Sequence, residues 1–284
     1  MFEFPLQRHP HPEVWLLMVG IFALYLGALR WWGPHHVSSG ERPASYRQVA
    51  CFAAGLVLLI VGATWPIHEL AERYLFSVHM SQHFIFSLMA PPLLLLGTPS
   101  WLARRLLRPR PVFAAMKVLT RPLLAMAIFN VFFVFSHWPT FVEFTLKFQL
   151  AHFFAHFALV ATALLMWWPV LSPLPEFARI SNPAQLLYLF GQTILPTVPA
   201  SFLTFSETTF YKTYAEAPRI LSGITALSDQ RIAGVVMKLG GGALLWTVIT
   251  VLFFRWSSNE EKGTVDAIDW QNLERSVNRT GSVR

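Results

Sequence analysis

The stretch VHMSQHFIFSLMAPPLLLLG, residues 78–97, joins a long apolar run to a polar beginning. It has about the length that a helix needs to cross the hydrocarbon of a bilayer. Its first turns carry four polar or soft side chains, His79, Met80, Gln82 and His83. A second stretch, QLAHFFAHFALVATALLMWW (residues 149–168), repeats the arrangement with His152 and His156. Because polar groups inside a membrane are costly and usually functional, both stretches predict a membrane helix whose polar end forms a site.

The composition is that of an integral membrane protein. Of 284 residues, 54% are hydrophobic and only 13% are charged, about half the charged share of a soluble domain. The net charge of +7 does not indicate nucleic acid as a partner, because in a membrane protein the distribution of positive residues between loops matters more. The only cysteine, Cys51, excludes an intrachain disulfide and any CxxC motif. A metal site therefore has to use histidine, methionine or carboxylate.

Breaks at proline, glycine and charged clusters divide the chain into seven predicted membrane helices. Helices are the expected form because each satisfies its own backbone hydrogen bonds in lipid. The predicted spans are Val14–Trp32, Arg47–Trp65, His79–Leu96, Leu123–Trp138, Gln149–Trp168, Ala184–Phe205 and Arg231–Phe254. They form one all-α, polytopic domain over residues 1–256. The polar residues 257–284 are predicted to be a cytoplasmic tail that is partly disordered.

Positively charged residues set the predicted orientation. The connection between the third and fourth spans is the most basic segment, with Arg104, Arg105, Arg108, Arg110, Lys117 and Arg121. By the positive-inside rule this connection is cytoplasmic. The N-terminus is then extracytoplasmic and the C-terminus is cytoplasmic.

In this orientation the histidines of three predicted spans lie at the same depth in the membrane. His79 and His83 open the third span, His137 closes the fourth, and His152 and His156 open the fifth. All are expected within about two helical turns of the extracytoplasmic surface. Residues four apart lie on one face of a helix, so each HxxxH pair can present two imidazoles to a single metal ion.

Imidazole suits copper, zinc, iron and nickel, and an added thioether favours Cu(I). The predicted ligands are His79, Met80, His83, His137, His152, His156 and Met237. Gln82, Asp229 and Gln230 are predicted to support these ligands by hydrogen bonds, although Asp229 and Gln230 can instead cap the last span. Two alternatives stay open: a haem held by histidines, and imidazoles that only link helices by hydrogen bonds.

Lys238 lies inside the seventh predicted span, where a retinal protein carries its Schiff-base lysine. A protonated Schiff base needs a counterion, and the third span contains no Asp or Glu. Asp229 is too far away, at nine residues or about 13 Å of helical rise. We therefore do not predict a retinal. Lys238 is expected to pair with polar groups of the bundle or to reach a cavity, and the candidate partners are Gln82, Asn130 and Gln192.

Four segments, in order, resemble the CtaG-type, multi-pass cytochrome c oxidase assembly factor family. They are HMSQHFIFSLMAPPLLLLGTP, SHWP, QLAHFFAHFALVATALLMWWPVL and LSDQRIAGVVMK, and the resemblance covers residues 47–255. It implies a multi-pass protein of the plasma (inner) membrane of a bacterium that is needed to make an active haem–copper oxidase. It also implies copper as the metal and the oxidase as the client. Lys238 stands where the family often carries a bulky aromatic residue.

Together, the residues and the resemblance predict an assembly factor for cytochrome c oxidase. It would bind copper, as Cu(I) or Cu(II), through histidines at the extracytoplasmic face and help to deliver it to the oxidase catalytic subunit. We predict a chaperone in contact with membrane lipid and not an enzyme, because no nucleophile or proton relay is visible. The alternatives are a haem-binding membrane protein (electron carrier or haem-insertion chaperone) and a metal-free scaffold for the oxidase subunit.

Overall fold

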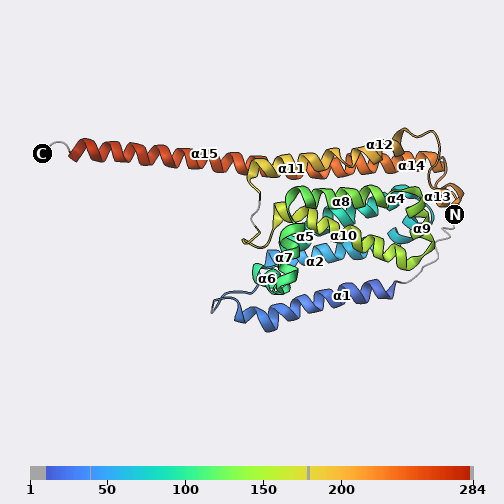
Figure 1. The fold of residues 1–284 in the computed structure, drawn as a ribbon, viewed down its shortest axis with the longest axis horizontal. Coiled ribbons are helices and arrows are strands. Elements are labelled where there is room, and N and C mark those ends of the chain that lie inside the picture. Colours follow the sequence, from blue (N-terminus) through green and yellow to red (C-terminus); the bar gives the residue numbers. More distant parts are fainter. Residues whose placement is uncertain (1–10, 39, 178–179, 282–284) are drawn as a thin grey trace.

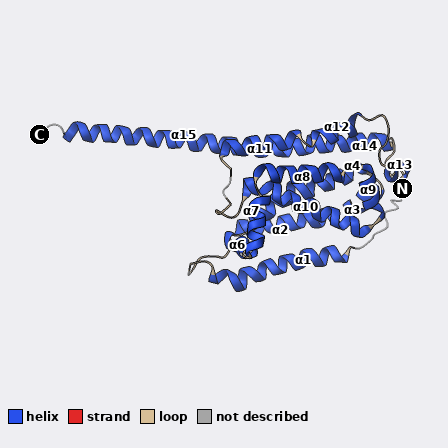
Figure 2. Ribbon diagram, viewed as in Figure 1, coloured by secondary structure: helices blue, strands red, loops and turns tan. Residues whose placement is uncertain are grey.

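The structure, a computed structural model, describes residues 11–38, 40–177 and 180–281, and it contains helices and no strand over these residues (Figure 2). The α-helices are α1 (Pro12–Gly27), α2 (Tyr46–Ala63), α3 (Ile67–Arg73), α4 (Phe76–Phe84), α5 (Ala90–Gly97), α6 (Ser100–Leu106), α7 (Arg110–Leu119), α8 (Pro122–Ser136), α9 (Pro139–Lys147), α10 (Gln149–Leu171), α11 (Asn182–Ile194), α12 (Thr197–Phe205), α13 (Lys212–Glu216), α14 (Ala226–Val235) and α15 (Gly241–Gly281). The π-helical segments η1 (Ala28–Trp32), η3 (Ile85–Met89) and η4 (Val236–Gly240) and the 3-10 turn η2 (Gly33–His35) extend some of them. The long helices run side by side along the bundle (Figure 1).

Six helical runs are long and apolar enough to cross a membrane, and each corresponds to a predicted span. They are Pro12–His35, Tyr46–Ala63, Phe76–Gly97, Gln149–Leu171, Asn182–Phe205 and Ala226–Glu261. The remaining prediction, Leu123–Trp138, corresponds to α8, which has 15 residues. α8 reaches the required length only together with α7, from which it is bent by 81°. The all-α, multi-pass membrane fold is confirmed, with six spans or with seven when α7 and α8 count as one.

The outer surface of the bundle is apolar. Leu16, Leu24 and Leu123 are between 75% and 80% exposed, and they belong to a large set of exposed aliphatic and aromatic side chains on the helices. A contiguous surface of this kind suits hydrocarbon and not water. These side chains therefore face lipid.

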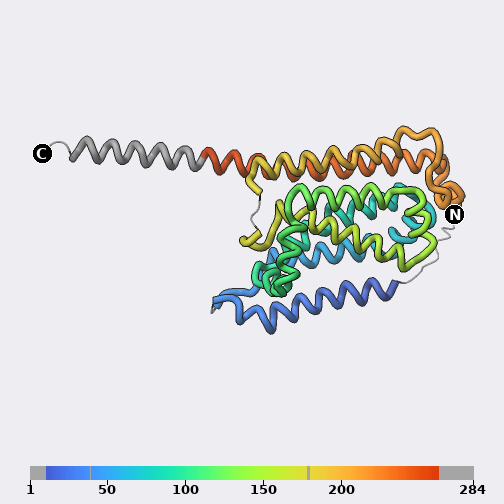
Figure 3. The backbone as a smooth tube through the Cα atoms, viewed as in Figure 1, coloured from blue at the N-terminus to red at the C-terminus, as the bar shows by residue number. Residues whose placement is uncertain are grey.

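α15 extends beyond the bundle (Figure 1), and Figure 3 traces the coloured part of the chain from α1 through the bundle into the first part of α15. Its backbone is helical as far as Gly281, so it includes most of the tail 257–284 for which we predict partial disorder. The tail contains no proline, which would break a helix. Residues 1–10 and 282–284 of the two predicted domains lie outside the described residues.

The described residues form three buried hydrophobic clusters, and two of them surround the site; the third joins Tyr25 and Ala28 to Trp101 and Leu102. Of the two around the site, the larger fills the middle of the bundle and includes Leu56, Phe86, Phe129, Met166 and Leu189, from α2, η3, α8, α10 and α11. The second surrounds the beginning of α4 and includes Phe76, Met80, Val142, Tyr211 and Tyr214. The first polar turns of α4 are thus packed inside protein at one end of the bundle.

The third span is interrupted where its prolines lie. α4 passes through η3 into α5, and Pro91 has no N–H for the carbonyl of Ser87, four residues earlier. The indole Nε1 of Trp167 on α10 donates a hydrogen bond to that carbonyl at 3.1 Å. The freed backbone group is therefore satisfied inside the membrane, and the same bond joins the two helices that carry the histidine pairs.

The beginning of α4 is held by α14. The buried carboxylate of Asp229 accepts hydrogen bonds from the N–H of Phe76 at 2.6 Å and from the N–H and hydroxyl of Ser77 at 3.3 and 2.5 Å. A negative charge at a helix N-terminus satisfies free N–H groups and interacts favourably with the helix dipole. α14 has its own cap, because the Thr225 hydroxyl accepts from the N–H of Ser228 at 3.1 Å. Asp229 therefore caps α4 and not the helix on which it lies.

α2 and α5 approach closely at Gly97. A Cβ atom at this position would lie 2.4 Å from the backbone nitrogen of Phe52, and a backbone atom cannot rotate out of the way. We expect Gly97→Ala to lower the free energy of unfolding by about 1–3 kcal/mol, seen as a lower thermal midpoint of the full chain in detergent. Gly20→Ala is the matched control, since a Cβ there meets nothing within 4 Å. Equal midpoints for the two variants would contradict the close crossing.

Candidate metal centre

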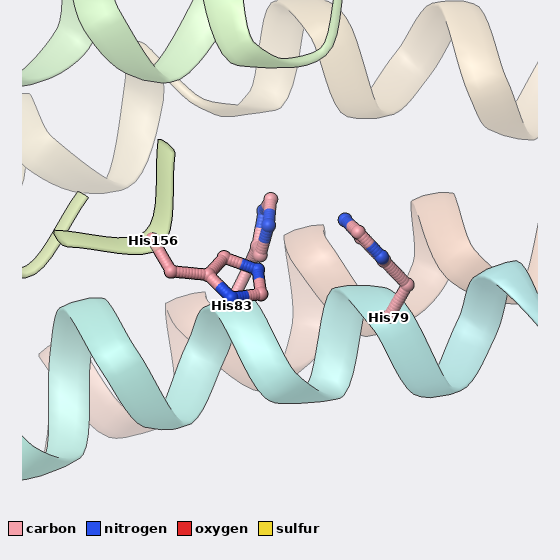
Figure 4. Close-up of side chains that lie close together, drawn as sticks. All are labelled: His79, His83 and His156. Atoms are coloured by element: carbon pink, nitrogen blue, oxygen red, sulfur yellow. The ribbon is translucent and has the colours of Figure 1, made fainter. Parts of the chain in front are cut away.

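The two histidine pairs meet at one end of the bundle. His79 and His83 project from α4 and His156 from α10 (Figure 4), and one ring nitrogen of each lies within 4.8 Å of the others. The Nε2 of His152 lies 3.0 Å from the Nε2 of His156. We call these four residues the imidazole cluster. Their convergence agrees with the HxxxH spacing.

These separations are close to those of a bound ion. First-row metals bind imidazole nitrogen at about 2.0–2.1 Å, so two nitrogens on one ion lie about 3–3.5 Å apart. His152 and His156 already satisfy this spacing. The nitrogens of His79, His83 and His156 are more widely spaced, within 4.8 Å of one another.

Hydrogen bonds on the far side of two rings decide which nitrogen is free. The hydroxyl of Tyr214 donates to the carbonyl of Ala71 at 2.7 Å, so at 3.1 Å it accepts from the Nδ1 of His79. The Nδ1 of His152 donates to the carboxylate of Glu72. In a neutral imidazole with a proton on Nδ1, Nε2 keeps its lone pair. His79 and His152 therefore each present a ligating Nε2.

Two residues that the sequence did not indicate, Glu72 and His68, lie behind His152. Glu72 also accepts from the Nε2 of His68 at 3.2 Å. The side-chain amide of Gln82 donates to the Nδ1 of His68 at 3.1 Å and to the carbonyl of Gly62 at 2.7 Å. Gln82, one of the predicted supporting residues, thus reaches an imidazole ligand through His68 and Glu72. The sequence feature that could have indicated these two residues is their spacing, because His68 and Glu72 are also four residues apart.

The charges behind the cluster follow from these contacts. Burial acts to raise the pKa of Glu72, but the hydrogen bond from His152 and the electrostatic effect of the neighbouring imidazoles outweigh it, and the pKa lies below its ordinary value. Burial lowers the pKa of His68 to about 4, against the opposing effect of Glu72. Glu72 is therefore ionised and His68 neutral near neutral pH. An ionised carboxylate behind a ligating imidazole fixes its orientation and raises its basicity.

His137 lies beside the cluster, against Met80. Its Nδ1 donates to the carbonyl of Phe133 at 2.5 Å, and its Nε2 faces the sulfur of Met80 at 3.2 Å. With its proton on Nδ1, the neutral ring carries its lone pair on Nε2. Met237 lines the same cavity of about 40 Å³ as Met80, His83 and His137. The predicted ligands thus fall into two groups, the imidazole cluster and a methionine–histidine pair beside a second methionine.

Asp229 and Gln230 bind backbone groups. Asp229 caps α4, as described above, and thereby positions the helix that carries His79. The side chain of Gln230 accepts from the N–H of Phe210 at 2.7 Å and donates to the carbonyl of Thr208 at 3.1 Å. Both residues hold segments around the site, and these hydrogen bonds do not run to an imidazole.

Lys238 lies on η4 and lines the same cavity as Gln192, one of its three expected partners. The side chain of Asn130, another expected partner, donates to the Oε1 of Gln192 at 2.8 Å. The amide of Gln82 bonds to Gly62 and His68 instead. Lys238 and Gln192 therefore border the same cavity, and Asn130 reaches Gln192 from α8.

Comparisons with known proteins are consistent with these motifs. The model of the family described as cytochrome c oxidase caa3 assembly factor (Caa3_CtaG) matches residues 17–259, which include all the predicted ligands. Searches of curated proteins and of solved structures gave no significant match.

Proposed function

This chain belongs to the cytochrome c oxidase caa3 assembly factor family, and we propose that it binds copper at the imidazole cluster and helps to deliver it to the oxidase catalytic subunit. As a member of this family it takes part in oxidase assembly, and its helices make it a multi-pass membrane protein. We place it in the plasma membrane of a bacterium, with the cluster at the extracytoplasmic face. Its role is to bind and pass on copper, without catalysis.

The observation that carries this proposal is the convergence of four imidazoles from α4 and α10. Tyr214 and Glu72 hold the Nδ1 protons of His79 and His152, so Nε2 is the ligating nitrogen of each neutral ring. Neutral imidazole is a good ligand for copper, and the donor set needs no thiolate. In this proposal copper is bound only temporarily. A cluster whose nitrogens are not all at ligand distance from one point favours the release of copper to another protein.

Charge supports the extracytoplasmic location. α6 and α7 lie at the end of the bundle opposite to the beginning of α4 (Figure 1). Their basic residues are Arg104, Arg105, Arg110 and Lys117. Because positive loops remain in the cytoplasm, the imidazole cluster is on the other side.

The cluster favours a bare ion over haem. The Nε2 atoms of His152 and His156 are 3.0 Å apart, which leaves no space for a porphyrin between these two rings. The test is the absorption spectrum and copper content of the full chain, purified in detergent and loaded with Cu(I). We expect bound copper without a Soret band. A Soret band in the isolated protein would favour the haem alternative, and failure to retain copper would favour the scaffold.

We expect Glu72→Gln to weaken copper binding about 10–100-fold, the usual effect of removing a carboxylate behind a ligating histidine. The neutral amide no longer fixes the proton of His152 on Nδ1. Affinity is measured by competition with a chromophoric Cu(I) chelator. Glu216→Gln is the matched control, because Glu216 is exposed on α13 at the same end of the bundle. Equal affinity in both variants would contradict the role of Glu72.

A further inference from the structure

We propose that copper has a second position in this chain, between the sulfur of Met80 and the Nε2 of His137, and that His83 passes it there from the imidazole cluster. This inference rests on the proposed copper function. It adds a soft position whose ligand chemistry differs from that of the cluster.

The contact between Met80 and His137 is a contact between two electron-pair donors. The Nδ1 proton of His137 goes to the carbonyl of Phe133, because a carbonyl can only accept. Nε2 of the neutral ring then has a lone pair, and a thioether sulfur has no proton to give. Two buried lone pairs that face each other at 3.2 Å gain nothing from their contact. A cation between them would make the arrangement favourable.

The distance suits a shared metal ion. A first-row metal binds nitrogen at about 2.0–2.1 Å and sulfur at about 2.3 Å, which places two such donors about 3–4 Å apart. The observed 3.2 Å lies in this range. Met80 is 1% exposed. The pair therefore lies inside the protein and not on its surface.

His83 connects the two positions. Its ring centroid lies 5.4 Å from that of His156 in the cluster and 5.3 Å from that of His137. Its Nδ1 is buried and has no hydrogen-bond partner among the described residues. His79 and His152, in contrast, are held through Nδ1 by Tyr214 and Glu72. His83 is therefore a ring of the cluster that lies between the two positions and whose Nδ1 is not held by a hydrogen bond among the described residues.

The second position has an open side. Met80, His83, His137 and Met237 line one cavity, which continues along Gln192 and Lys238. The cavity is about 40 Å³, enough for one or more waters. Met237 can add a second thioether from this side. An ion held by Met80 and His137 thus has room for a third ligand on this side, such as Met237 or a water.

The ligand set selects Cu(I). Both donor atoms are neutral and unprotonated, so the ion enters without releasing a proton and without any change of oxidation state. Thioether sulfur favours the softer Cu(I), and burying one positive charge costs less than burying two. The second position is thus expected to take Cu(I) from the imidazole cluster and not to take Cu(II).

The test is a Cu(I) titration of the purified full chain against a chromophoric chelator, combined with copper-edge X-ray absorption. We expect the wild-type chain to bind two Cu(I) ions with sulfur in the copper environment. Met80→Leu, which conserves volume and stability, is expected to bind one and to lose the sulfur signal. Met166→Leu is the control. Met166 is a buried methionine of the same cavity, but it lies ten residues beyond His156, or about 15 Å of helical rise.

The outcomes separate this inference from the proposed function. Binding of a single Cu(I) by the wild type, or two Cu(I) in Met80→Leu, would overturn the second position and leave the copper function intact. Wild-type protein that binds no copper would overturn both.

Discussion

Replacement of the imidazole cluster by alanine is expected to abolish cytochrome c oxidase activity in cells that depend on this chain. His79, His83, His152 and His156 supply the converging nitrogens, and no cysteine near them can take their place, because Cys51 lies on α2. Without them copper has no first binding position. Oxidase activity in isolated membranes should fall to the level of cells without the chain, and the copper content of the oxidase should fall with it.

The design must separate loss of the site from loss of the protein. Three of the four rings are buried, at 3%, 7% and 4% exposed for His79, His83 and His152, so the abundance of each variant is measured by immunoblot. The single variant His156→Ala changes the most exposed ring of the cluster and is expected to lower activity at normal abundance. His35→Ala and His36→Ala, between α1 and α2, are controls. Normal activity in the quadruple variant would leave only the scaffold alternative.

The second large effect is expected from Asp229→Ala. The change removes a carboxylate that accepts from the N–H groups of Phe76 and Ser77 and from the Ser77 hydroxyl. Leaving buried donors unsatisfied costs about 1–3 kcal/mol each. We therefore expect a loss of about 3 kcal/mol or more, measured as a lower thermal midpoint in detergent. Copper affinity should fall as well, because the first turn of α4 carries His79.

Thr225→Ala is the matched control for this prediction. It removes the side-chain cap of α14 itself, which costs about 0.5–2 kcal/mol, and it leaves α4 capped. Asp229→Ala should therefore lower the thermal midpoint more than Thr225→Ala. A smaller or equal shift would contradict the conclusion that Asp229 holds the beginning of α4.

Much of the fold could be predicted from the sequence, because each segment that crosses lipid must be a long apolar helix. Apolar runs broken by proline, glycine and charge gave the spans within a few residues, from Tyr46–Ala63 to Gln149–Leu171. The exception is α8, whose 15 residues are short for a span. Its 81° bend from α7 was not predictable, because both segments are apolar enough to count together and the angle depends on packing.

Only part of the candidate site could be predicted, because the sequence shows which residues share a face of one helix but not which helices are in contact. Spacing within a helix showed that His79 and His83, and likewise His152 and His156, share a face. Spacing cannot show contacts between helices, such as that of Met80 with His137. Glu72 was missed because α3 is a short helix between two spans, and its orientation toward α10 is set by the turns around it.

Transfer of copper to the oxidase tests the proposed function at its final step. The full chain is loaded with an enriched copper isotope as Cu(I) and mixed with oxidase isolated from cells that lack the chain. The oxidase is then separated and analysed for the isotope and for activity. We expect the isotope in the oxidase together with recovered activity, and neither when the cluster variant is used. Recovery of activity without transfer of the isotope would contradict copper delivery and support a scaffold.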